Sequence, residues 1–237
     1  MGKTLATLAL CLGLICNSFS GTVPEYRDAS PVSAITNNNR AIKSSTSGKV
    51  DLPLGVIKDY LAKPVFSGKV LLCLGESPYY PYQEPNAAVF YNSQGHTSRY
   101  EVVRSSSISN GLDQVSRIYG NRFFGNFDSV TFLTLRENQD KSVQYSNDMY
   151  VIIENRFFNS FFRGLLNFPL LGDKLKKSFQ DEQDNFVKSV NRVVSRASQS
   201  PQAALKSLES YTNGPVSFSQ GEIQYFKESL EKLDKKK

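Results

Sequence analysis

Short apolar segments, each bounded by glycine, asparagine, aspartate or serine, dominate the middle of the chain. They are rich in Val, Ile, Leu and Phe and alternate little with polar residues. Runs of this kind are typical of strands that are buried on both faces. We therefore predict strands at residues 70–74, 100–103, 129–135 and 150–153, and a fifth at 87–91.

Helical patterns surround these segments. A short amphipathic helix is predicted at 54–61. Residues 111–119, between the second and third of the four main strands, are helix-like. Strands that alternate with helices favour a mostly parallel sheet with flanking helices, so the predicted fold class is α/β and Rossmann-like.

The C-terminal third, from about residue 174, is predicted to be helical. Apolar residues from Phe179 to Ala197 recur at spacings of three and four. Ser219 and Glu222 have the spacing of a capping box, which opens a final helix with Ile223, Phe226, Leu230 and Leu233 on one stripe. We expect this stripe to pack on the protein's own sheet; binding of a partner helix is the alternative.

The first 20 residues have the parts of a secretory signal peptide. Lys3 precedes an uncharged apolar run at 5–16, and small residues follow it. This run is too short to span a bilayer. We expect cleavage near Gly21 and a secreted or periplasmic protein, with an N-terminal anchor or a buried helix as the alternative. Residues 21–50 are polar and predict a flexible leader, and 51–237 a single α/β domain.

Loss of the signal peptide changes the cysteine content and the charge. Cys11 and Cys16 would leave, so Cys73 would remain as a single cysteine, which we predict to be a small buried side chain rather than a reactive thiol. Loss of Lys3 lowers the formal charge from +6 to +5. No basic stripe is interleaved with aromatic residues, so nucleic acid is not an expected partner. This modest positive charge fits a loose attraction to an anionic surface as well as it fits binding of nucleic acid.

Two aromatic features remain open to interpretation. Residues 157–171 are unusually apolar for a connection, and either are buried or form a surface that contacts a membrane or a protein partner. The sequence Asn-Arg-Phe-Phe occurs at 121–124 and again at 155–158. In a parallel sheet these copies would lie at opposite ends, and we interpret both Phe pairs as packing residues.

Several enzyme classes do not fit the sequence. Ser77 follows a strand-like run, but Tyr79 stands where a nucleophile elbow needs glycine, and the single histidine, His96, follows too closely for a triad hydrolase. One histidine and one mature cysteine cannot build a zinc site from nitrogen and sulfur ligands. The glycine-rich phosphate motifs of nucleotide-binding proteins are absent.

In open α/β sheets, ligands bind at the carboxyl ends of the strands. Loops there would bring a glycine and polar residues of both charges to one edge. The predicted binding residues are Gly75, Glu76, Ser77, Arg104, Ser105, Glu137 and Glu154.

Four segments, KVLLCLGES, YEVVRSSSIS, FDSVTFLTLRE and MYVIIENRF, together resemble the strand series of class I S-adenosylmethionine-dependent methyltransferases. The resemblance covers roughly residues 66–158 and is best at Phe127-Asp128. It implies a Rossmann-like fold with S-adenosylmethionine bound after the first strand. The cofactor loop is degenerate, since it contains only Gly75, and Arg104-Ser105 replaces the acid that holds the ribose.

Arg104 followed by three serines suits a phosphate or a carboxylate better than a ribose diol. Three functions therefore stay open: a degenerate methyltransferase-like transferase, a phosphoribosyltransferase-like protein, and a non-catalytic binding or interaction protein. The expected ligand is a small anionic or nucleotide-like molecule. The sequence does not decide whether the protein is an enzyme.

Overall fold

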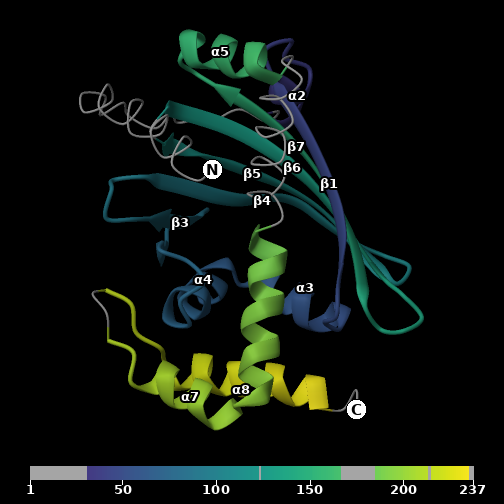
Figure 1. Ribbon diagram of the computed structural model, residues 1–237, viewed down its shortest axis with the longest axis vertical. Coiled ribbons are helices and arrows are strands. Elements are labelled where there is room, and N and C mark those ends of the chain that lie inside the picture. The colour runs from purple at the N-terminus through teal and green to yellow at the C-terminus, as the bar shows by residue number, and fades with distance from the viewer. Residues whose placement is uncertain (1–30, 123, 167–184, 213–214, 235–237) are drawn as a thin grey trace, which may run out of the picture.

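A single antiparallel sheet of seven strands forms the centre of the protein (Figure 1). The computed structural model describes residues 31–122, 124–166, 185–212 and 215–234. The sheet order is β1-β7-β6-β5-β4-β3-β2, and each neighbouring pair is antiparallel. The strands are β1 (Ile42–Val50), β2 (Tyr80–Gln83), β3 (Ala88–Tyr91), β4 (Thr97–Ile108), β5 (Gly111–Arg122), β6 (Gly125–Glu137) and β7 (Val143–Ile153).

The predicted parallel, Rossmann-like sheet is therefore wrong, and the short connections explain why. Ile108 pairs with Gly111 across a two-residue turn, in which Asn110 has a φ of 54°. Arg122 likewise pairs with Gly125 at the next turn. Parallel neighbours need a crossover of a dozen or more residues, so connections this short permit only antiparallel pairing. The resemblance to methyltransferases, and with it the expectation of S-adenosylmethionine, loses its basis.

Two predicted elements have the wrong type of secondary structure. Of residues 70–74, predicted as a strand, 70–73 form the end of helix α4 (Pro64–Cys73) and Leu74 is its C-cap; Val70 is fully buried. Residues 111–119, predicted as a helix, belong to strand β5. A short apolar run without periodicity does not distinguish a buried strand from a buried helix, which accounts for the first error.

The predicted flexible leader also needs correction in its second half. Residues 31–36 form helix α2 (Pro31–Thr36), and β1 pairs with β7 over its whole length. Alternate side chains of β1 are more exposed, which is typical of a strand with one face on the core. Residues 21–30 and the predicted signal peptide lie outside the described part of the chain.

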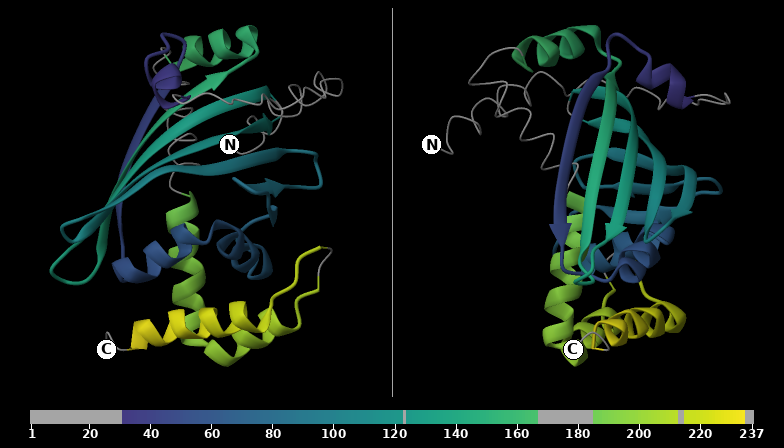
Figure 2. Two further views of the ribbon diagram at one scale, coloured as in Figure 1. Left: turned by 180° about the vertical axis from the view of Figure 1, so that it is seen from behind. Right: turned by 90° about the vertical axis from the view of Figure 1, so that its right-hand side faces the viewer.

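Helices cover the sheet at its two ends, as the views in Figures 1 and 2 show. At one end lie α3 (Leu54–Ala62), α4, a helix described over 185–199, α7 (Pro201–Glu209) and α8 (Gln220–Asp234). At the other end lie α2 and α5 (Arg156–Leu166). The predicted helix at 54–61 is confirmed as α3. None of the described helices has the length and apolarity needed to cross a bilayer.

Three apolar clusters hold these parts together. The largest joins one end of the sheet to α3, α4, the 185–199 helix, α7 and α8, and includes Leu135, Val143, Val194 and Phe226. The second joins the other end of the sheet to α5 through Phe127 and Phe162. The third lies around Ile35 of α2, which packs on Val115 and Val130.

The predicted C-terminal helix is confirmed in detail. Ser219 N donates to Glu222 Oε2 at 2.8 Å, and Glu222 N donates to Ser219 Oγ at 3.2 Å, which is a complete capping box. Ile223, Phe226 and Leu230 of the predicted stripe are buried. Their burial supports packing within the protein.

Candidate functional site

A surface pocket of about 420 Å³ lies where α3 meets α4, beside β2 and the first turn of α8. Its volume is within the range of small-molecule sites. The pocket has an ammonium, a carboxylate, an amide, a hydroxyl and two aromatic rings in its wall. These groups belong to Lys63, Glu222, Gln83, Ser219, Phe66 and Tyr225.

Local sequence explains the shape of the corner. A residue before proline avoids the helical region, and Lys63 accordingly has φ −126° and ψ 66°. Pro64 occupies the start of α4, where its missing N–H costs nothing. The chain therefore ends one helix and begins another at Lys63. The Ser67 hydroxyl braces this corner, since it donates to the carbonyl oxygens of Tyr60 and Lys63 at 2.5 and 3.0 Å.

Lys63 is the free cation of this pocket in the described part of the chain. Its ammonium lies 3.3 Å from the centroid of the Tyr225 ring, and no ion pair of the described residues includes it. Tyr225 in turn packs edge-on against Phe66, with 5.2 Å between ring centroids. Burial, followed by the charge of Asp59, raises the pKa of Tyr225 to about 12, so the phenol stays neutral at physiological pH.

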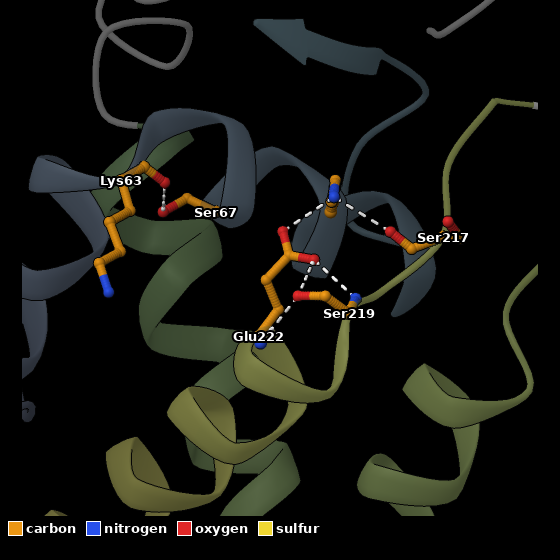
Figure 3. A network of polar contacts seen from close by, with 6 residues as sticks. Lys63, Ser67, Ser217, Ser219 and Glu222 are labelled. Atoms are coloured by element: carbon orange, nitrogen blue, oxygen red, sulfur yellow. Dashed lines mark hydrogen bonds and ion pairs between the residues drawn. The ribbon is translucent and has the colours of Figure 1, made fainter.

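Glu222, in contrast, is fully engaged. Lys69 Nζ donates to Glu222 Oε1 at 2.8 Å and to the Ser217 carbonyl at 3.0 Å. Figure 3 shows this network, with the side chain of Lys63 lying apart from it. Burial alone would raise the pKa of Glu222, but hydrogen bonds from Lys69 and Ser219 outweigh it and lower the pKa. The carboxylate is therefore a weak base and is poorly suited to activate Ser219.

A second polar cluster lies on the sheet, on the same face as the largest apolar cluster. Gln114 Nε2 donates to Tyr100 Oη at 2.5 Å and to Ser116 Oγ at 3.0 Å, and the Ser116 hydroxyl donates to Tyr100 Oη at 3.0 Å. Gln114 and Ser116 are buried. Because the three side chains bond to one another, internal hydrogen bonding accounts for this cluster.

The predicted binding residues are not brought together. Gly75, Glu76 and Ser77 form the turn after α4, where Glu76 Oε2 and Oε1 accept hydrogen bonds from Arg192 Nε at 2.8 Å and Arg196 Nη2 at 2.6 Å. These two ion pairs attach the turn after α4 to the 185–199 helix. Glu76 therefore already has two cationic partners within the protein.

The other four predicted residues are spread over the sheet. Arg104 and Ser105 are exposed on β4 beside a bulge, and their cross-strand partners are Val115 and Gln114. Glu137 ends β6 opposite Val143. Glu154 follows β7 and donates from its backbone N–H to Asn126, at the start of β6. Glu137 and Glu154 therefore lie at opposite ends of the same strand pair, because antiparallel neighbours reverse direction.

Sequence reasoning missed Lys63, Phe66, Gln83 and Tyr225. The predicted capping box did point to this region, because it identified Ser219 and Glu222 as the start of a helix. The Lys63-Pro64 pair was a further signal, since it marks a helix boundary. Nothing in the sequence shows that this boundary faces α8, which begins more than 150 residues later.

Comparisons with known proteins assign no family. No family model matches the chain, and no curated protein matches it. A conserved protein from Geobacillus kaustophilus has a similar structure, with a TM-score of 0.46 and 8% identity over 66% of this chain and 97% of that one. The hypothetical protein jhp0584 from Helicobacter pylori gives a TM-score of 0.45 and 8% identity, and covers 74% of this chain and 97% of its own. An uncharacterized protein from Rhizobium leguminosarum gives 0.35 and 12%, with coverages of 64% and 97%. Likenesses at this level carry neither an activity nor a ligand to this chain.

Proposed function

We propose that this protein is a non-catalytic binding protein, and that its ligand is a small anion with an aromatic or apolar part. The observation that carries the proposal is Lys63: an exposed ammonium at the wall of a ligand-sized pocket, with an aromatic ring as its neighbour in place of a carboxylate. A ligand anion would supply the missing charge partner.

The remaining groups of the pocket favour an aromatic or apolar ligand body. Phe66 and Tyr225 are already packed edge-on, so the aromatic wall is formed before any ligand arrives. Gln83 on β2 and Ser219 at the start of α8 add an amide and a hydroxyl that orient polar atoms of the ligand. A preformed apolar wall with a few polar groups is the usual composition of a small-molecule site.

The pocket supports binding better than catalysis. A serine nucleophile needs an adjacent base, and among the described residues the carboxylate beside Ser219 is that of Glu222, whose pKa is lowered by its hydrogen bonds. His96 lies on the β3–β4 turn, where its backbone N–H donates to Asn92, and it is not among the residues of the pocket. The pocket residues that the structure describes therefore supply no group that would activate Ser219.

The test is a thermal-shift and calorimetric screen with four probes: phenyl phosphate, benzoate, inorganic phosphate and neutral benzyl alcohol. We expect phenyl phosphate and benzoate to raise Tm most, because a ligand bound only to the native state stabilises it. Lys63→Gln should weaken their binding about tenfold or more, since a charge-assisted hydrogen bond is lost. Lys58→Gln, on α3 but outside the pocket, is the matched control and should bind like wild type. Equal binding by wild type and Lys63→Gln would contradict the proposal.

Export is part of the proposed function. Protein recovered from a secretion-competent host should begin near Gly21, as N-terminal sequencing or intact mass would show. Recovery of a chain that still begins at Met1, or one retained in the membrane, would remove this part of the proposal and leave the pocket unaffected.

A further inference from the structure

Helix α5 exposes two phenylalanines. Phe157 is 72% exposed and Phe161 is 38% exposed, and both are among the few large apolar side chains on the surface of the described chain. Their rings stack at 6.2 Å between centroids with 10° between planes. We call Phe157 and Phe161 the aromatic ridge. Exposed aromatic area of this kind disfavours an exclusively aqueous environment.

The same helix is firmly attached to the sheet. Phe162 is buried and contacts Phe124, with 5.9 Å between ring centroids, and Phe158 packs against the same cluster. Asn159 is buried on this side as well. The aromatic ridge is therefore held outward by a helix whose opposite side is in the core, and it is not a loose end that collapses onto the protein.

Two arginines flank the ridge. Arg156 and Arg163 are seven residues apart, which places them on one side of the helix two turns from each other. Both are exposed, and no ion pair of the described residues includes either of them. We call Arg156 and Arg163 the cationic flank. The helix contains no acidic residue, so its charge is positive throughout.

We propose that α5 lies on an anionic lipid bilayer, with the aromatic ridge in the interfacial region and the cationic flank on the lipid headgroups. An amphipathic helix with aromatic residues on one side and arginines on the other is suited to this position. The described part of the helix, Arg156–Leu166, has 11 residues, about 16 Å at 1.5 Å per residue, which is too short to cross the hydrocarbon core. Its attachment to the sheet along one side favours a position along the membrane surface.

A second copy of the chain fits this surface less well. Two rings provide only a small part of the roughly 800 Å² that each partner of a stable interface buries. A symmetric contact through α5 would also bring arginines near arginines, with no acidic residue on the helix to offset them. An anionic surface avoids both problems, because the charges are complementary and no fixed interface area is needed.

The experiment uses tryptophan as a local reporter, because the natural chain contains none. Full-length F157W is mixed with vesicles of phosphatidylcholine alone or with added phosphatidylglycerol. We expect its emission to shift to shorter wavelength, and to be quenched by lipids brominated on their acyl chains, only with the anionic vesicles. V102W is the matched control, since Val102 is also exposed but lies on β4, and its emission should not respond.

Affinity for the anionic vesicles gives the second readout, again with F157W as the background. Loss of one aromatic side chain in F161S should weaken binding about tenfold. Each of R156A and R163A should weaken it about fivefold, and added salt should reduce the contribution of both arginines. Melting curves of all variants confirm that they are folded.

Three results would overturn the proposal. One is an F157W emission that does not respond to anionic vesicles. Another is an equal response to neutral and anionic vesicles. The third is a concentration-dependent shift of F157W without any vesicles, accompanied by a dimer in solution, which would assign the ridge to a second copy. The pocket at Lys63 plays no part in this proposal.

Discussion

At the scale of single residues, Lys63 and Cys73 show how position alters chemistry. Pro64 sets the non-helical backbone conformation of Lys63, and the ammonium of Lys63 contacts the Tyr225 ring. Cys73 ends α4, half-buried against the largest apolar cluster. The sequence predicted a small core side chain at position 73. The structure places it at the border of the core.

The reactivity of Cys73 follows from this position. Burial raises the pKa of its thiol from 9.0 to about 11. Because the thiolate is the reactive form, an increase of two pKa units predicts alkylation of native protein at pH 8 about a hundredfold slower than in urea. Cys73→Ser measures the background from Cys11 and Cys16 if these remain in the chain. Equal rates with and without urea would show that the thiol is freely exposed.

A buried ion pair joins β5 to β6. Arg117 donates from Nε and Nη2 to the two carboxylate oxygens of Asp128 at 2.9 and 2.7 Å, and its side chain is only 2% exposed. Asp128→Ala should lower the free energy of unfolding by about 3–5 kcal/mol, because it leaves a buried cation without its carboxylate. Urea unfolding followed by circular dichroism measures this loss.

The pair of Glu137 and Lys141, which is much less buried than Arg117 and Asp128, provides the control for Asp128→Ala. Its atoms are 3.6 Å apart, and the lysine side chain is 66% exposed. Glu137→Gln should change stability by less than about 0.5 kcal/mol. If Asp128→Ala costs no more than Glu137→Gln, solvent reaches the Arg117 site and the pair is not buried.

At the scale of elements, the helical pattern at 54–61 and the capping box were reliable signals, whereas the helix-like pattern at 111–119 and the unpatterned apolar run at 70–74 were not. Helix α3 and the α8 capping box follow from the sequence, because each has an apolar stripe or a capping pair that only a helix satisfies. Residues 70–73 form the end of α4 and Leu74 caps it, and the interpretation of 70–74 as a strand rested on composition alone. Pro64, a helix-start signal six residues earlier, carried the missing information.

The relative direction of neighbouring strands was predicted wrongly because the short turns between them were not recognised. Asn110 and Gly111 mark a hairpin, and recognising it would have made β4 and β5 antiparallel neighbours. The predicted binding site depended on parallel strands, whose carboxyl ends share one edge. Once neighbours alternate in direction, Glu137 and Glu154 separate to opposite ends. For the two Asn-Arg-Phe-Phe copies the correction has the opposite effect. Phe124 and Phe158 were predicted to lie at opposite ends of the sheet, but they pack in the same apolar cluster.

Glu76 links two elements and predicts a pH dependence. Burial alone would raise the pKa of Glu76, but hydrogen bonds and charges from Arg192 and Arg196 lower it below 4.5 overall. A lowered native pKa means that the contact stabilises the fold above about pH 4.5 and that this contribution is lost as the pH falls through the native value. Both arginines are well exposed, so the contribution is about 1 kcal/mol or less.

The measurement is the free energy of unfolding between pH 7 and pH 3. Glu76→Gln should flatten the acid side of this curve, and Arg192→Gln should flatten it partly, because one of the two cations remains. An unchanged slope in Glu76→Gln would mean that the two arginines do not bind this carboxylate in solution.

At the scale of the whole molecule, the sheet is completed by β1, an edge strand that the local sequence pattern did not predict. β1 is rich in serine and lysine and lies about 100 residues before its partner β7. Its pairing is set by long-range register and not by local preference, so the sequence alone predicted a flexible leader. Ile42 and Val50, at the two ends of β1, each belong to a different apolar cluster of the sheet. Loss of β1 would therefore affect both ends of the protein.

Gly48 provides a direct test of this closure. It pairs with Tyr145, and a Cβ at position 48 would lie 2.5 Å from Tyr145 Oη and 2.7 Å from the ring carbon that bears it. Tyr145 is buried, so it has little room to withdraw. Gly48→Ala should therefore cost about 1–3 kcal/mol by overpacking. It should also speed hydrogen exchange of the β1 and β7 amides more than that of the β4 and β5 amides, because the strain acts on the β1–β7 pair.

Gly55→Ala is the matched substitution, since a Cβ on this α3 residue has no atom within 4 Å. Alanine loses less conformational freedom in a helix than glycine, so this variant should be more stable than wild type by up to about 1 kcal/mol. The same chemical change is thus expected to act with opposite sign at the two positions. If Gly48→Ala is also stabilising, and exchange of the β1 amides is unchanged, β1 does not close against Tyr145 and the sheet ends at β7.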